Sequence, residues 1–225
     1  MSTYTWQDAF QRVAAQVSRS IADSEMLFAI NDAQALIWYA YDWRESLKEL
    51  APFWLVSLVQ DYSVVPSDFS GLRKAWFSVA DPNAPTWAQL EVKKDVNLTH
   101  IRGVPTILGY VPEKNKLRVW PLPPEGVENM LWQVSAVYKA QPTKITSSNV
   151  ATFAIPWRDQ YFRTCCLALL WALTPEASER KLQLRQELEG ELRIMAVQEG
   201  TDIGEPPSIA PKEPLVRHVS VSWWR

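Results

Sequence analysis

The sequence predicts an α+β protein in which a helical bundle carries an antiparallel β insert and ends in an extended C-terminal arm. Apolar residues recur at helical spacing near both ends of the chain. Residues 53–140 are instead rich in β-branched and aromatic residues and are interrupted by prolines, as is typical of strands and turns. Residues 201–225 contain four prolines and no apolar period, which indicates an extended arm.

Residues 1–52 are expected to supply two N-terminal helices. Over residues 5–21 the apolar side chains fall on one face, and Thr5 with Asp8 offers a capping box at the start of this helix. A second helix is expected over residues 24–50, before a proline that marks its end. Together the two predicted helices make a helical hairpin.

Residues 53–140 are expected to form the antiparallel β region. Proline-rich turns separate its strands, which are expected at 53–66, 72–80, 87–94, 104–111, 116–121 and 130–139. Over residues 131–137 apolar and polar residues alternate, but neither of the two faces is purely polar. Such a pattern indicates a strand that is buried on both sides or covered by a neighbouring subunit.

Residues 141–200 are expected to form two further helices that pack with the N-terminal pair. The first has Pro156 at a first-turn position and is apolar nearly all round over residues 161–173, so it should lie centrally. The second starts with the cap and first-turn signals of residues 174–176 and ends at Gly200. Its charged side is interpreted as a solvated surface.

No catalytic, metal or cofactor site is expected. Neither histidine, His100 or His218, has a Cys, Asp or Glu at metal-ligand spacing. The two cysteines, Cys165 and Cys166, are adjacent within an apolar run and are interpreted as buried structural residues. Neither glycine-rich phosphate-binding motif occurs. The sequence therefore gives no reason to predict an enzyme.

Charge and hydropathy exclude further classes of partner. The formal net charge of −2 supplies no basic field for nonspecific binding to nucleic acid. No window of about 18 uninterrupted apolar residues exists, and the N-terminus lacks the basic start and apolar stretch of a signal peptide. We therefore expect synthesis in the cytoplasm and no membrane partner.

Tryptophan is unusually frequent, with 12 in the chain. Its flat apolar body suits protein cores, subunit interfaces and sugar-stacking platforms alike. Most tryptophans lie on apolar stripes, whereas Trp223 and Trp224 follow the proline-rich arm at the C-terminus. We therefore expect the end of the arm to bind a partner, through Leu215, Val216, Arg217, His218, Val219, Val221, Trp223, Trp224 and Arg225.

Several turn and strand motifs occur in the same order as in a known family. They are a Tyr-containing element ending in Pro-x-Asp, a Gly-x-Pro segment, and a proline-rich segment before a Tyr-containing strand. The residues that match these motifs are Tyr62, Pro66, Asp68, Gly103, Pro105, Trp120, Pro121, Pro123 and Tyr138. Over most of residues 20–200 the chain resembles the head-to-tail adaptor, or head completion, proteins of tailed bacteriophages.

The resemblance implies a non-enzymatic connector of the virion. Such proteins form a ring, commonly of twelve copies, beneath the portal protein, and they link the DNA-filled capsid to the tail or nozzle. DNA in transit contacts their lumen, and the C-terminal segment reaches the portal or a neighbouring subunit. The alternative that composition leaves open is a Trp-rich carbohydrate-binding module.

Overall fold

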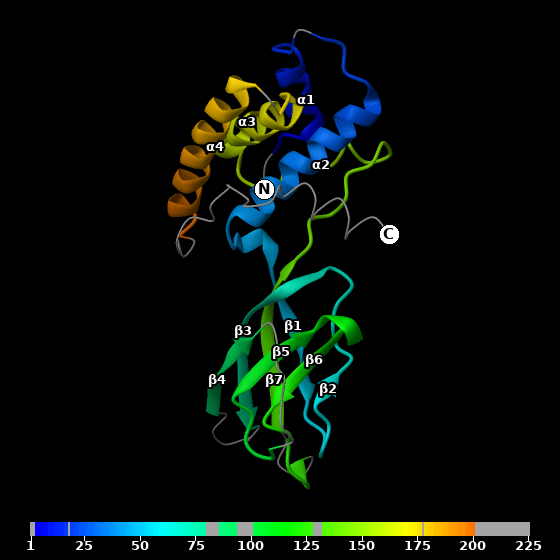
Figure 1. Ribbon diagram of the computed structural model, residues 1–225, viewed down its shortest axis with the longest axis vertical. Helices are drawn as coiled ribbons and strands as arrows, with labels where there is room; N and C mark the ends of the chain where they lie inside the picture. The colour runs from blue at the N-terminus through cyan, green and yellow to red at the C-terminus, as the bar shows by residue number, and fades with distance from the viewer. Residues whose placement is uncertain are drawn as a thin grey trace. The chain divides into compact units, whose positions relative to one another are not determined.

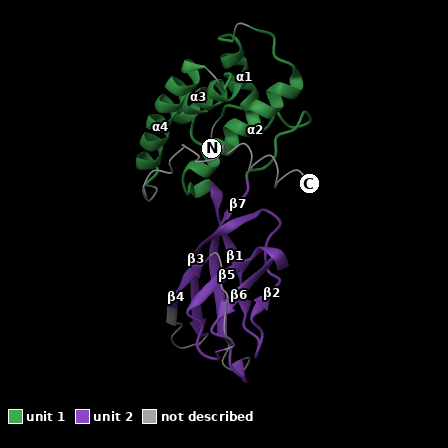
Figure 2. Ribbon diagram, viewed as in Figure 1, with its two compact units in different colours: residues 1–45, 142–225 green, residues 46–141 purple. Residues whose placement is uncertain are grey.

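The chain divides into two compact units. In the computed structural model the described residues are 3–17, 19–79, 86–93, 101–127, 132–176 and 178–200. One unit joins residues 1–45 with residues 142–225, and the other comprises residues 46–141 (Figure 2). We call them the helical unit and the β unit.

The described part of the helical unit contains four α-helices: α1 (Trp6–Ala14), α2 (Asp23–Ala40), α3 (Phe162–Leu173) and α4 (Glu179–Gln198) (Figure 1). Short 3₁₀ helices span Arg44–Ser46 and Asp159–Tyr161. The capping box predicted for the first helix is confirmed. The Thr5 hydroxyl accepts from the Asp8 backbone N–H at 3.2 Å, and the Asp8 carboxylate accepts from the Thr5 backbone N–H at 2.7 Å.

Helix α3 lies at the centre of the helical unit. It contacts α1, α2 and α4, which confirms the prediction made from its nearly all-round apolar surface. An aromatic cluster beside it accounts for part of the tryptophan content. The rings of Trp38 and Trp43 both meet Trp157 edge to face, with centroids 6.1 and 6.4 Å apart, and all three side chains are buried.

The β unit is one seven-stranded sheet. Its strands are β1 (Leu47–Trp54), β2 (Asp61–Tyr62), β3 (Phe69–Val79), β4 (Thr86–Lys93), β5 (Ile107–Val111), β6 (Lys116–Trp120) and β7 (Trp132–Ala140). The strand order is β1-β7-β3-β4-β5-β6-β2. Strands β4 and β5 are parallel, and the other neighbouring pairs are antiparallel.

The sheet curls into a half-barrel around its own apolar core. Strands β1 and β2 are its two edges, yet the rings of Phe53 on β1 and Tyr62 on β2 are 5.0 Å apart. Phe69 on β3 likewise lies 4.7 Å from Tyr110 on β5, across the intervening strand. A flat sheet would keep these strands too far apart for ring contact, because neighbouring strands are spaced by about 4.8 Å.

The predicted fold class, a helical bundle with an antiparallel β insert, is wrong. The described residues form a mixed α+β structure that contains a seven-stranded curled sheet and four α-helices. The helix expected over residues 24–50 ends at Ala40, and residues Leu47–Trp54 form strand β1. In addition, the pairing of β4 with β5 is parallel, so the β region is not purely antiparallel.

A β-bulge explains the misassigned segment. The register of β1 on β7 shifts between Leu50 and Phe53, and both of these side chains are buried. A bulge inserts extra residues, so two side chains on one face become three residues apart instead of two. Leu50 and Phe53 therefore lie three residues apart on one face of the strand, a spacing that also fits one face of a helix.

Strand β7 buries one of its two faces over residues 132–137. Trp132, Val134 and Ala136 are buried in the core of the half-barrel. The alternate residues Gln133 and Ser135 are only half-buried on the opposite face. One face of the strand thus packs into the core of its own unit.

Candidate interaction surface

The described residues hold no cluster suited to metal binding or nucleophilic chemistry. No group of three or more His, Cys, Asp or Glu side chains among them is placed to hold a metal ion. Burial raises the pKa of Cys166 to about 11, and complete burial also raises the pKa of Cys165 well above its ordinary value. Both thiols therefore stay protonated at neutral pH, which is the wrong state for a nucleophile. No described helix is long and apolar enough to cross a bilayer.

The predicted partner-binding residues lie outside the described residues. This holds for all nine, which are Leu215, Val216, Arg217, His218, Val219, Val221, Trp223, Trp224 and Arg225. Within the described part of the chain, a different surface has the composition of an interaction site.

This surface lies at the end of strand β1 and on two loops of the β unit, and it consists of exposed apolar side chains. Each is about half exposed, from 43% for Val56 to 55% for Val104. We call it the loop surface, and its residues are Trp54, Val56, Leu58, Ile101 and Val104. Exposed apolar groups that gather in one place mark interaction sites, whereas single ones are common on any protein.

Backbone hydrogen bonds hold the two loops to a third segment that lies between them. The Leu58 N–H donates to the Pro123 carbonyl at 3.1 Å. On the other side, the Leu122 N–H donates to the Ile101 carbonyl at 2.9 Å, and the Gly103 N–H donates to the Leu122 carbonyl at 3.0 Å. The exposed side chains of both loops are therefore parts of one region of the β unit.

The loop surface lies at the end of the β unit that is remote from its chain connections. Strand β1 begins where the chain enters this unit, and β7 ends where the chain leaves it. The loop after β1 is bonded to the first residue of β7, because the Leu55 N–H donates to the Trp132 carbonyl at 2.8 Å. Neither connection to the rest of the chain therefore runs through this end.

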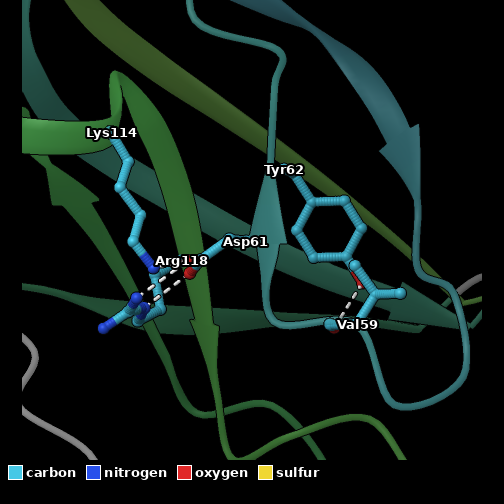
Figure 3. A network of polar contacts seen from close by, with 5 residues as sticks. All are labelled: Val59, Asp61, Tyr62, Lys114 and Arg118. Atoms are coloured by element: carbon cyan, nitrogen blue, oxygen red, sulfur yellow. Dashed lines mark hydrogen bonds and ion pairs between the residues drawn. The ribbon is translucent and has the colours of Figure 1, made fainter.

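The Tyr62 side chain forms hydrogen bonds to the backbone of the loop that carries Val56 and Leu58. Its hydroxyl donates to the Val59 carbonyl at 2.9 Å (Figure 3) and accepts from the Val56 N–H at 3.1 Å. Nearby, the Ser57 hydroxyl accepts from the Gly126 N–H at 2.8 Å. A loop held at so many points loses little further conformational entropy when a partner binds.

Leu58 has a backbone conformation that is rare for its residue type. Its φ is +59°, in the left-handed region, which costs an L-residue roughly 1–2 kcal/mol. Its side chain nevertheless remains 44% exposed and gains no burial within the chain in return. Strained residues of this kind persist where the surrounding bonds hold them, and they are frequent at functional sites.

A charged cluster holds strand β2 just beyond the loop. Arg118 of β6 donates twice to Asp61, from Nε at 2.5 Å and from Nη2 at 2.8 Å, and Lys114 Nζ donates at 3.0 Å (Figure 3). These two cations, Arg118 foremost, lower the pKa of Asp61 to about 2. Asp61 is thus ionised at any pH near neutral, and it clamps the two-residue strand to the sheet.

The motif residues of the sequence serve as structural supports within the β unit. Asp68 accepts from Lys48 at 2.5 Å and from the Tyr138 hydroxyl at 3.0 Å, so two motif residues meet directly. A Cβ on Gly103 would lie 3.5 Å from Pro121, so a second pair is in close contact. The motifs thus hold loops and strands in place and do not themselves form the exposed surface.

Sequence reasoning missed the loop surface because residues 53–66 were assigned to one strand. A signal was present, since residues 51–60 contain no charged side chain. That signal is ambiguous without the structure, because an uncharged run of this length is equally typical of a buried strand.

Comparison with protein families matches residues 4–209 to the SU10 adaptor protein. A search of curated proteins finds no match. The family match extends over nearly the whole chain and covers both units. It supports the adaptor class that the motif order implied, and this class is structural and not enzymatic. The chain belongs to the SU10 adaptor protein family, whose members are structural adaptors of bacteriophages.

Proposed function

We propose that the protein is a head-to-tail adaptor that forms a ring beneath the portal and links the DNA-filled capsid to the tail. The observation that carries this proposal is the family match over residues 4–209. The loop surface adds a rigid apolar area on which a protein partner can dock. The proposed partners are the portal protein, a tail or nozzle protein and further copies of the chain, with twelve copies as the expected ring.

DNA is proposed to touch the lumen of the ring only transiently, as it passes through. A channel through which DNA slides should not hold phosphates tightly, and tight holding needs many unpaired Lys and Arg side chains. The net charge of −2 is consistent with such a lumen. The location that follows from this role is the head-tail junction of the virion, after synthesis in the host cytoplasm.

The C-terminal arm is proposed as an anchor on the portal or on a neighbouring subunit, with the portal preferred. Support comes from the sequence, because a proline-rich segment precedes Trp223 and Trp224. A segment of 17 residues, 201–217, spans up to roughly 50 Å at about 3.1 Å per residue. That reach is enough to leave the parent subunit.

The experiment is to mix the purified chain with the portal ring of the same phage and to measure the mass and symmetry of the product. Native mass spectrometry and negative-stain electron microscopy should show a ring of adaptor copies stacked on the portal. A chain that stays monomeric in the presence of a large excess of portal would contradict the proposal. A monomer in the absence of portal would not, since the portal can act as the template for the ring.

Deletion of residues 218–225 tests the anchor separately. We expect the truncated chain to keep its circular dichroism spectrum and melting temperature and to bind the portal more weakly. The two tryptophans could together contribute on the order of several kcal/mol per subunit. Unfolding of the truncated chain would show instead that these residues belong to the core.

The carbohydrate-binding alternative has no observation in its favour. Among the tryptophans whose side chains are described, Trp54 alone is mainly exposed. One exposed ring among those described does not make a sugar platform.

A further inference from the structure

The C-terminal end of helix α4 is fastened to the segment that precedes helix α3. Tyr161 ends the short 3₁₀ helix Asp159–Tyr161, and its hydroxyl donates to Glu199 Oε1 at 2.9 Å. The same oxygen of Glu199 lies 3.4 Å from Arg158 Nε, and the Glu199 side chain is only 10% exposed. The residue that caps the end of α4 is thus held by two side chains from another part of the helical unit.

Glu199 is an unfavourable residue for this position unless it has such partners. The C-terminal end of a helix carries partial negative charge, which a basic side chain stabilises and a carboxylate destabilises. None of residues 195–198, which form the last turn of α4, is basic. The last carbonyls of a helix also lack partners within it, so helix ends fray. The contacts with Arg158 and Tyr161 therefore explain a glutamate here, and they oppose fraying of the last turn.

Gly200 follows Glu199 directly and ends the helix. Its φ is +63°, in the left-handed region that closes many helices and that glycine adopts without strain. The Glu199 N–H still donates to the Met195 carbonyl at 3.0 Å, and the Gly200 N–H donates to the Val197 carbonyl at 3.1 Å. The helix therefore stops at a defined residue, immediately before residues 201–225 of the proposed anchoring arm.

The segment that holds Glu199 also holds the N-terminal part of the chain. The Asp159 carboxylate accepts from the Thr3 N–H at 2.7 Å and from the Thr3 hydroxyl at 3.0 Å. Beside it, the Tyr4 ring stacks on Phe162 with centroids 4.2 Å apart. Residues 158–162 thus fix both the first and the last described residues of the helical unit.

We propose that Glu199 is a positioning residue for the C-terminal arm, because its contacts with Tyr161 and Arg158 fix the point from which the arm leaves the helical unit. This inference rests on the proposed role of the arm as an anchor. Proline-rich segments act as semi-rigid spacers, so the point where such an arm begins determines which surfaces its end can reach. A loose last turn of α4 would lengthen the tether and lower the effective concentration of Trp223 and Trp224 at their partner.

Hydrogen exchange of the free full chain tests the contact without any partner. Glu199→Ala removes both contacts, so the protection factors of the amides of residues 196–200 should fall at least about threefold. If the contacts did nothing, the same substitution would raise these protection factors or leave them unchanged. The reason is that it removes a negative charge from the C-terminal end of the helix and introduces a strong helix former. A rise or no change would therefore overturn the proposal.

Glu187→Ala is the matched control for this experiment. Glu187 also accepts from an arginine of the neighbouring segment, Arg163 Nη2 of α3 at 3.1 Å, but it lies in the middle of α4. This variant should leave the protection of residues 196–200 as in the wild type. Equal losses in the two variants would overturn the proposal, because the effect would then be a general loosening of α4.

Titration with the portal ring tests the link between Glu199 and the arm. Glu199→Ala should raise the dissociation constant of the full chain at least about threefold, and it should have no effect in a chain that already lacks residues 218–225. An equal rise in both chains would show that Glu199 acts through the helical unit, and it would overturn the proposal. Unchanged binding of the full-length variant would overturn it too. A wild type that does not bind the portal would instead contradict the proposed function, and the positioning role would fall with it.

Discussion

Asp61 is the residue whose ionisation most directly holds the loop region together. Its pKa is about 2 in the folded protein, below the ordinary 3.8, because Arg118 and Lys114 bind the carboxylate. A carboxylate whose pKa is lowered by folding stabilises the folded state at pH values above its unfolded pKa. This stability is lost as the pH falls and the carboxylate binds a proton. We therefore expect the β unit to lose stability as the pH falls from about 4 to about 2.

Asp61→Asn should remove this part of the pH dependence and lower the stability at pH 7 by about 1–3 kcal/mol, because Arg118 then loses its charged partner. Urea unfolding of the variant and the wild type at several values of pH checks both effects. Other carboxylates with lowered pKa values, such as Asp8 and Asp68, contribute equally to the pH dependence of stability in the variant and the wild type. Parallel pH profiles would show that the cluster contributes nothing.

Asp32 on α2 has the opposite behaviour. Burial raises its pKa to about 6, and the charge of Lys181 only partly offsets this effect. The folded state therefore favours the protonated form, and stability is lost as the pH rises from about 4 to about 6. Asp32→Asn should stabilise the protein at pH 7 by on the order of 1 kcal/mol and leave it unchanged near pH 3. Melting temperatures across this pH range check it, with the exposed Asp23→Asn on the same helix as control.

At the scale of elements, the loop between β1 and β2 combines strain with exposure. Leu58→Gly should relieve the positive φ and raise the free energy of unfolding by up to about 1 kcal/mol. It also removes an exposed apolar side chain from the loop surface, so binding of a partner at this surface should weaken. Urea unfolding measures the first effect and titration with portal or tail protein the second. A stability gain without any change in binding would remove Leu58 from the interface.

Tyr62→Phe probes the same loop without changing its surface. The variant loses the hydroxyl that joins Val56 and Val59, which should cost about 1 kcal/mol. Hydrogen exchange of the backbone amides in residues 55–59 should become faster, while exchange in the distant strand β4 stays as in the wild type. Equal exchange in the two proteins would show that the tyrosine does not restrain the loop.

At the scale of the whole molecule, the two units have separate cores. One core is formed by residues of the four helices and the segments around them, and the other by residues of the sheet and its loops. The chain passes between the units only near residues 45–46 and 141–142. We expect residues 46–141, expressed alone, to fold as a sheet with a cooperative unfolding transition. Circular dichroism and calorimetry check this, and an unfolded fragment would show that the sheet depends on the helices.

Much of the local structure is predictable from neighbouring residues. The capping box of Thr5 and Asp8, the proline-marked turns and the central position of helix α3 each depend on contacts or periods within one segment. The motif order that indicated the adaptor family is also a property of the linear chain. The nine partner-binding residues in 215–225 remain a prediction.

Tertiary structure alone decided the strand identity of Leu47–Trp54, the parallel pairing of β4 with β5, and the curl that brings Phe53 to Tyr62. It also decided that Trp54, Val56 and Leu58 are exposed. The physical reason is that a bulge, a strand order and an exposed face depend on which distant segments pair. The spacing of apolar residues along the chain indicates only that a side chain prefers to be buried. It does not indicate which distant surface buries that side chain.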